Sequence, residues 1–205
     1  MTTFLNSSRR LTGVLLAMGL LAPVASWAQN PAPTPAPTSK VRITTSMGDI
    51  EAELYADKAP KTVANFVQYV NDKHYDGTIF HRVIPGFMVQ GGGYDAQYRE
   101  KKTRAPVAHE GRQALAAGLK NTTGTLAMAR TNDPQSATSQ FFINVVDNAF
   151  LDPSFQSFGY TVFGKVTSGM DVLQKIRNTP TGAGGPFPTD VPRTPVVIQT
   201  ITLLK

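Results

Sequence analysis

The sequence predicts a mainly β domain, a barrel or sandwich of short strands with helices as caps. Short apolar segments, several of them alternating with polar residues, recur along positions 41–204 and are separated by turns that contain Gly and Pro. Two well-separated segments instead repeat apolar residues at the three- and four-residue spacing of a helix. Because strands and helices do not alternate along the chain, a Rossmann-type parallel sheet is disfavoured.

The first elements of the domain are expected to be a β-hairpin and a helix. Positions 41–45 and 50–54 alternate apolar and polar residues on either side of a polar turn, which is typical of a hairpin. Pro60 suits the first position of a helix, where its missing N–H is not needed. One apolar stripe follows at helical spacing, formed by Val63, Phe66, Val67 and Val70.

The remainder of the domain is expected to contain short strands, a second short helix and one long loop. A Pro85-Gly86 turn interrupts the β-forming residues of 78–88. Apolar residues at helical spacing indicate the second helix over 170–177, and the Gly- and Pro-rich segment 181–192 indicates a loop. Further strands are expected at 124–128, 141–146, 161–166 and 195–204.

Residues 1–28 have the features of a cleavable secretory signal peptide. Two arginines precede a short apolar stretch, and Ser26 and Ala28 place small residues at the −3 and −1 positions of a cleavage after Ala28. The apolar stretch is shorter than the roughly 20 residues that span a bilayer, so no stable membrane insertion is expected after cleavage. An uncleaved N-terminal anchor is the alternative.

Export would place the protein in the periplasm or, alternatively, outside the cell. Residues 29–39 include four prolines, which prevent helices and sheet ladders, so an extended spacer is expected there. The folded domain is then expected to occupy residues 40–205.

The composition excludes several classes of function. The chain has no cysteine, which excludes disulfides, thiol nucleophiles and cysteine-ligated metals. Its three histidines lack metal-ligand spacing, so no metal site is expected. The net charge of +6 is scattered, without Lys/Arg runs interleaved with aromatic residues, so a nucleic acid is not an expected partner.

The densest unusual segment is FHRVIPGFMVQGG at 80–92, which places Arg82 among apolar and aromatic residues and Gln90 eight positions later. Four further segments accompany it, namely GTLAMAR at 124–130, SQFFI at 139–143, Phe150-Leu151 and FGYTVFGKV at 158–166. In this order and spacing they resemble the cyclophilin family of peptidyl-prolyl isomerases over about residues 41–204. The segments MARTNDP and FGYTVFGKV resemble its bacterial periplasmic branch in particular. The resemblance implies a closed eight-stranded antiparallel β-barrel capped by two α-helices.

The resemblance also implies the roles of individual residues. Arg82 corresponds to the catalytic arginine of the family, and Gln90 to a glutamine that bonds the substrate beside it. Phe150 stands where eukaryotic members have a tryptophan whose indole N–H helps to bind cyclosporin, and Tyr160 stands where many members have a pocket histidine. The other substrate-binding positions wall the proline pocket (Phe87, Met88, Phe142 and Leu151), lie beside the bound peptide (Ala129, Arg130 and Thr131) or line the groove (Gln140).

The implied reaction is the rotation of Xaa-Pro amides in unfolded or partly folded exported proteins, by an enzyme expected to act as a monomer. Resonance gives this C–N bond partial double-bond character and a rotation barrier of roughly 18–20 kcal/mol. No bond is broken, so no nucleophile, metal or cofactor is required. A fixed guanidinium at Arg82 would stabilise the lone pair that the prolyl nitrogen regains in the twisted state. Arginine suits this role because its charge persists near neutral pH.

Two other classes of function compete with the isomerase. In the first, the groove binds proline-containing segments as a non-catalytic chaperone module. In the second, Ser139, His81 and Asp133 form a hydrolase triad, although the chain lacks a G-x-S-x-G elbow. For Arg82 itself, the alternative to catalysis is a structural pairing with a buried carboxylate. His81 is expected to be a hydrogen-bonded structural residue, because isomerisation requires no proton transfer.

Overall fold

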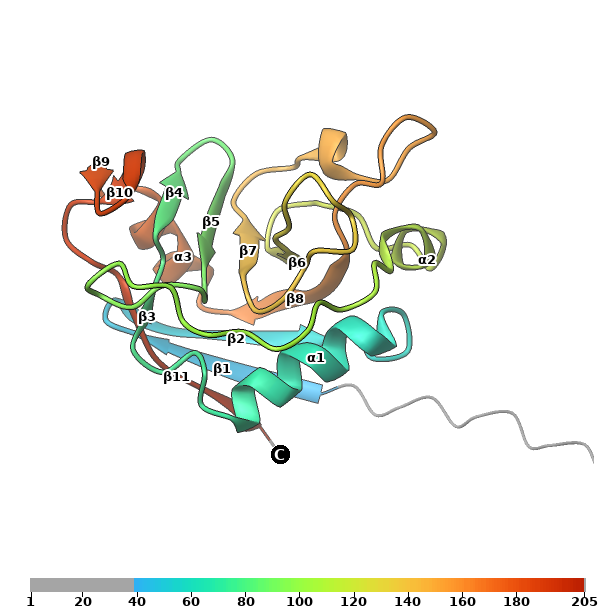
Figure 1. Cartoon of the computed structure of the whole chain (residues 1–205), viewed down its shortest axis with the longest axis horizontal. Helices are drawn as coiled ribbons and strands as arrows, with labels where there is room; N and C mark the ends of the chain where they lie inside the picture. Colours follow the sequence, from blue (N-terminus) through green and yellow to red (C-terminus); the bar gives the residue numbers. More distant parts are fainter. Residues whose placement is uncertain (1–38, 205) are drawn as a thin grey trace, which may run out of the picture. The chain divides into compact units, whose positions relative to one another are not determined.

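The structure, a computed structural model, describes residues 39–204. The predicted signal peptide and the spacer up to position 38 lie outside the described residues. Within 39–204 the chain forms eleven β-strands, three α-helices and one 3-10 helix (Figure 1). No helix in this range is long and apolar enough to cross a membrane.

The bounds of the elements, in chain order, are as follows. The first half contains β1 (Ser39–Thr45), β2 (Gly48–Leu54), α1 (Pro60–Asn71), β3 (Thr78–Ile79), β4 (Arg82–Ile84), β5 (Met88–Gly91) and α2 (Gly111–Ala116). The second half contains β6 (Thr125–Met128), β7 (Phe141–Asn144), the 3-10 helix η1 (Ala149–Leu151), β8 (Val162–Ser168), α3 (Met170–Arg177), β9 (Thr181–Gly184), β10 (Phe187–Pro192) and β11 (Val197–Leu204).

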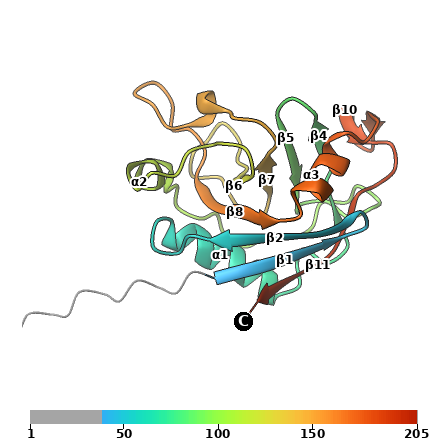
Figure 2. The ribbon, with the colours of Figure 1, turned by 180° about the vertical axis from the view of Figure 1, so that it is seen from behind.

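One sheet organises the described part of the chain. Its nine strands follow the order β3-β11-β1-β2-β8-β6-β7-β5-β4, and all of its strand pairs are antiparallel. The predicted N-terminal hairpin is confirmed, since β1 and β2 pair Val41 with Ala52 and Ile43 with Ile50, all of them buried. α1 packs against β11, and α3 packs against β2, β4 and β5 on the side seen in Figure 2.

The prediction of a mainly β fold is confirmed, but the closed eight-stranded barrel is wrong. The sheet is an open half-barrel whose two edge strands are β3 and β4. Only Phe80 and His81 separate these two strands in the sequence. β3 pairs with β11, whereas β4 pairs with β5. Both edges therefore belong to one chain segment, and no ladder can join a segment to itself.

The prediction of two helical caps is also wrong, because α2 is a third α-helix in the described range. This helix has six residues and buries only Gly111 and Ala114 among them. An apolar stripe needs two turns to become visible as a periodic pattern, so α2 carries too few buried positions to be recognised in the sequence. α1 and α3, which are longer, lie where the sequence predicts them.

The segment 181–192, expected to be a loop, instead forms the hairpin of β9 and β10. Its register is irregular, because Phe187 faces Gly184 while Val191 faces Gly182. The hairpin packs against β4, at the left of Figure 1. Gly and Pro are depleted in strands, so composition alone predicts a loop here.

Alternate residues of β5 to β8 belong to two different apolar clusters. The main core includes Val89, Leu126, Met128, Phe141, Ile143 and Phe163 from these strands. A second, smaller cluster consists of Met88, Ala127, Phe142, Leu151 and Val162. The main core centres on Phe66 of α1, whose ring lies 5.1 Å from those of Tyr75 and Phe163 and 5.5 Å from that of Phe141. The second cluster lies across the sheet from this core, because successive side chains of a strand point to opposite faces.

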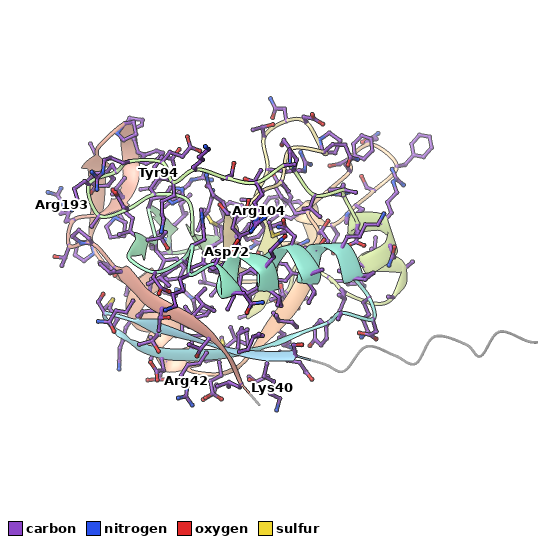
Figure 3. The ribbon with its side chains drawn as sticks, turned by 60° about the horizontal axis from the view of Figure 1, so that its bottom comes forward. Lys40, Arg42, Asp72, Tyr94, Arg104 and Arg193 are labelled. Carbon is purple, nitrogen blue, oxygen red and sulfur yellow. The ribbon has the colours of Figure 1, made fainter. Side chains whose placement is uncertain are left out.

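The long segment between β5 and α2 is held against the end of α1. The backbone N–H of Arg104 donates to Tyr69 Oη at 2.8 Å, and Arg104 Nε donates to Asp72 Oδ2 at 2.9 Å. Figure 3 shows Arg104 and Asp72 together beside α1. These contacts fix the course of the segment that later supplies Glu100 and Thr103 to the candidate site.

Glu110 connects α2 to the start of α1. Its carboxylate accepts hydrogen bonds from the backbone N–H groups of Lys61 (3.1 Å) and Thr62 (2.8 Å) and from Thr62 Oγ1 (2.8 Å). The first N–H groups of a helix have no partner within the helix, and the N-terminal end of its dipole favours an anion. Glu110 and Thr62 are both buried, so the two bonds to Thr62 satisfy groups that water does not reach.

We expect Glu110→Ala to lower the free energy of unfolding by about 1–3 kcal/mol, because it leaves buried donors without an acceptor. Urea unfolding at neutral pH measures this change. Asp57→Ala is the control, since Asp57 is exposed, and its effect should stay within about 0.5 kcal/mol. Equal effects of the two substitutions would contradict the capping role of Glu110.

Candidate active site

Nine of the residues predicted to form the site surround one pocket of about 200 Å³. They come from β4, from β5 and the turn before it, from β7, and from the segments after β6 and before β8, together with η1. The pocket is smaller than the roughly 300–1,000 Å³ of a site for a drug-sized ligand, so it suits a single ring or side chain. The lining residues are Arg82, Phe87, Met88, Gln90, Ala129, Arg130, Phe142, Leu151 and Tyr160.

A single row of paired residues crosses the sheet beneath this pocket. Arg82 pairs with Gln90, Gln90 with Phe142, and Phe142 with Ala127. Directly opposed residues in antiparallel strands project from the same face, so the row presents a cation, an amide, an aromatic ring and a small residue in sequence. The strand register therefore brings together residues that lie far apart in the chain.

The floor of the pocket is apolar. Met88, Phe142 and Leu151 are buried members of the second apolar cluster. The ring of Phe142 meets that of Tyr160 edge-on, with 5.6 Å between centroids. This arrangement can hold a small apolar ring without offering it a hydrogen bond.

Arg82 lies on the edge strand β4 and keeps 45% of its side chain exposed. Within residues 39–204 the only carboxylate within 4.0 Å of its guanidinium is that of Asp190, with 3.9 Å between Arg82 Nε and Asp190 Oδ2. The Asp190 side chain is itself 35% exposed, so Arg82 is not the partner of a buried carboxylate. Its terminal nitrogens remain available to a ligand in the pocket.

Gln90 is oriented by Gln140 rather than by Arg82. Gln90 Nε2 donates to Gln140 Oε1 at 3.0 Å. Gln140 and Thr131 do not line the pocket but lie in an adjoining groove of about 360 Å³. The groove shares Gln90, Ala129 and Arg130 with the pocket and adds Glu100, Thr103, Ser136 and Thr138. Sequence analysis missed these four polar residues, because isolated polar residues in irregular segments carry no pattern.

Arg130 fixes the loop that closes the pocket. Its Nε and Nη2 atoms donate to the carbonyl of Gly159 at 3.0 and 2.9 Å, and its Nη1 atom donates to the carbonyl of Thr131 at 2.8 Å. The guanidinium also lies over the ring of Tyr160, 4.6 Å from its centroid. Arg130 thus supports the Tyr160 wall through both hydrogen bonds and a cation–π contact.

Phe150 is the one predicted site residue that the structure places at neither the pocket nor the adjoining groove. Its ring is 71% exposed and stacks on Phe87 with 5.6 Å between centroids. Phe87 lines the pocket, so Phe150 extends the apolar wall outward from it.

His81 and Ser139 do not form a catalytic pair. Both are buried, and neither His81 Nδ1 nor Ser139 Oγ has a hydrogen-bond partner among the described residues. The imidazole of His81 lies between the rings of Tyr94 and Phe187, with centroids 4.8 and 5.2 Å away. Burial lowers the pKa of His81 to about 4, so the side chain is neutral at physiological pH. The geometry gives the hydrolase alternative no support.

Comparisons with known proteins agree on one family. Residues 40–203 match the family model described as cyclophilin type peptidyl-prolyl cis-trans isomerase/CLD. The chain is 49% identical to peptidyl-prolyl cis-trans isomerase A of Dickeya dadantii, over 97% of this chain and 99% of that protein. It is 51% identical to peptidyl-prolyl cis-trans isomerase B of Escherichia coli, over 78% of this chain and 96% of that protein.

A solved structure is similar as well. The crystal structure of a cyclophilin type peptidyl-prolyl cis-trans isomerase from Cryptosporidium parvum, in the presence of the dipeptide Ala-Pro, matches with a TM-score of 0.62 and 28% identity. The match covers 81% of this chain and 99% of that one.

The pKa of His81 predicts a loss of stability in acid. Between pH 6.5 and about 4 the unfolded chain binds a proton that the folded state does not accept. The free energy of unfolding therefore falls as the pH falls through this window, and the full contribution is present above pH 6.5. We expect His81→Phe to reduce the stability lost between pH 7 and pH 5 by about 2 kcal/mol. Urea unfolding of both proteins at the two pH values measures it, and an unchanged pH dependence would contradict it.

Proposed function

The chain belongs to the family of cyclophilin-type peptidyl-prolyl cis-trans isomerases, and we propose that Arg82 catalyses the rotation of Xaa-Pro amides over the apolar floor of its pocket. One observation carries this mechanism. Arg82, Gln90 and Phe142 pair across neighbouring strands, so the exposed guanidinium of Arg82 and the buried ring of Phe142 line the same pocket. This pocket has the size of a single side chain.

The chemistry requires both halves of this arrangement. An amide in the planar form resists rotation with a barrier of roughly 18–20 kcal/mol. An enzyme lowers the barrier only if it binds the twisted form better than the planar forms. The pyrrolidine ring rests on Met88, Phe142 and Leu151, while the Arg82 guanidinium donates toward the prolyl nitrogen, whose lone pair is free in the twisted form. No proton is transferred, which agrees with the neutral, buried state of His81.

Gln90 supplies the second polar contact of the proposed mechanism. One of its amide N–H groups is committed to Gln140. Within the described residues its other N–H and its carbonyl oxygen have no side-chain partner, so they can bond the substrate backbone beside Arg82. The Gln140 contact holds the amide in place before the substrate arrives, which lowers the entropy cost of binding.

The proposed substrates are proline-containing segments of unfolded or partly folded exported proteins. The Ala-Pro dipeptide named with the Cryptosporidium structure supports a proline-containing ligand. The signal-like pattern of residues 1–28 supports a periplasmic location, with secretion as the alternative.

We expect Arg82→Ala to lower kcat/KM by roughly 100- to 1000-fold, as for the loss of one preorganised donor. NMR exchange spectroscopy on an Ala-Pro peptide reads the cis/trans rate directly. Arg42→Ala is a matched control, because the Arg42 side chain is also 45% exposed and lies on β1, away from the pocket. Equal rates for Arg82→Ala and the unmodified protein would remove Arg82 from its role. A folded protein that binds the peptide without accelerating exchange would favour the non-catalytic chaperone alternative.

The position of Phe150 predicts weak binding of cyclosporin. Its exposed ring stacks on Phe87 next to the pocket but offers no donor, unlike the tryptophan of eukaryotic members. We expect Phe150→Trp to raise cyclosporin affinity roughly two- to tenfold, as for one added hydrogen bond, with activity on Ala-Pro retained. Competition against labelled cyclosporin measures both proteins. Nanomolar affinity of the unmodified protein would contradict the prediction.

A further inference from the structure

Asp190 lies in an irregular part of strand β10 and faces Arg82. Phe187 of β10 faces Gly184, but Val191 faces Gly182, so three residues of β10 lie opposite one residue of β9. Extra residues of this kind bend a strand and change the direction of a side chain, and they are frequent next to active sites. Asp190 lies in this irregular stretch, directly before the buried Val191.

Asp190 also has an unusual backbone conformation. Its φ is 67°, in the left-handed region, which residues other than glycine rarely adopt. Such a conformation persists only where the surrounding structure enforces it, and it is typical of functional sites. Tyr98 packs closely against the hairpin turn, because its ring leaves no room for a Cβ atom at Gly185.

The β9–β10 hairpin contacts two successive residues at the edge of the sheet, His81 and Arg82. The ring of Phe187 stacks on His81, 5.2 Å away, and meets Tyr94 edge-on at 5.0 Å. Figure 3 shows Tyr94 beside the hairpin. The next residue, Arg82, faces Asp190 with 3.9 Å between Nε and Oδ2. The packing of Phe187 against His81 and Tyr94 thus holds the hairpin against the sheet edge, and this places the Asp190 carboxylate beside the Arg82 guanidinium.

We propose that Asp190 is a positioning residue for Arg82 and that its charge disfavours an acidic residue before the substrate proline. This inference rests on the proposed function of Arg82. A carboxylate on the Nε side of a guanidinium restrains the flexible arginine stem and leaves the two Nη atoms for the prolyl amide. The Asp190 side chain is 35% exposed, so its field reaches solvent and the substrate residue that enters beside Arg82.

Asp190→Asn is the decisive substitution, because asparagine keeps the size of the side chain and tolerates a positive φ. NMR exchange is measured on peptides with Lys, Ala or Glu before the proline. We expect the Lys-to-Glu ratio of kcat/KM to fall about two- to fivefold, as for an exposed ion pair, and the difference to shrink at high salt. For Ala-Pro we expect a lower kcat with little change in KM, because only the transition state requires the oriented guanidinium.

Asp49→Asn is the matched control. Asp49 on β2 lies with its Oδ2 atom 3.8 Å from Nε of Arg42 on β1. Asp49→Asn therefore removes the same charge from a similar ion pair that is distant from Arg82 along the sheet. An unchanged Lys-to-Glu ratio in Asp190→Asn would overturn the inference, and so would an identical shift in Asp49→Asn. These results leave the proposed function intact, because that function is tested separately by Arg82→Ala. Asp190→Gly relieves the backbone strain and also removes the carboxylate, so it should reproduce the selectivity of Asp190→Asn.

Discussion

Successive side chains of strands β5 to β8 point to opposite faces of the sheet, and both the core and the pocket depend on this alternation. Each of these strands has the main core on one face and the second apolar cluster on the other. In β7, Phe141 enters the core and its neighbour Phe142 forms the pocket floor. A shift of the pairing by one residue would exchange the two faces. The same register that packs the core therefore assembles the site, and the two cannot vary independently.

The site combines an apolar floor with a charged guanidinium, and the sheet places the first on an interior strand and the second on an edge strand. Buried charges are costly unless they are paired. The row across the sheet accordingly runs from Phe142 on the interior strand β7 to Arg82 on the edge strand β4. At the edge the guanidinium stays solvated, while its Cβ still shares a face with the aromatic ring. An exposed edge strand can pair with strands of other molecules, and the β9–β10 hairpin packs against the edge strand β4.

Local patterns in the sequence are sufficient to predict the N-terminal hairpin, α1, α3 and the strands β6, β7, β8 and β11. The pocket residues are implied by the resemblance of the motifs around Arg82, Phe142 and Tyr160 to the cyclophilin family, and nine of the predicted residues line one pocket. The sheet edges were not predictable in this way, because the split of residues 78–84 depends on which distant strand each half meets. The Glu110 cap joins residues 48 positions apart, and Asp190 is a lone carboxylate in a Gly- and Pro-rich segment, so neither leaves a local signal.

The pairing of β1 with β11 joins the first and last strands of the described domain. The ribosome synthesises the chain from its N-terminus, so β1 can pair with β11 only after the last strand of the described domain has emerged. β11 is also the partner of β3, one of the two sheet edges. The sheet is therefore completed late, because a nascent chain truncated before Val197 lacks the strand that joins β1 to β3, and β1 then has only β2 as a neighbour. A domain of this topology therefore gains its complete sheet only after its last strand has been synthesised.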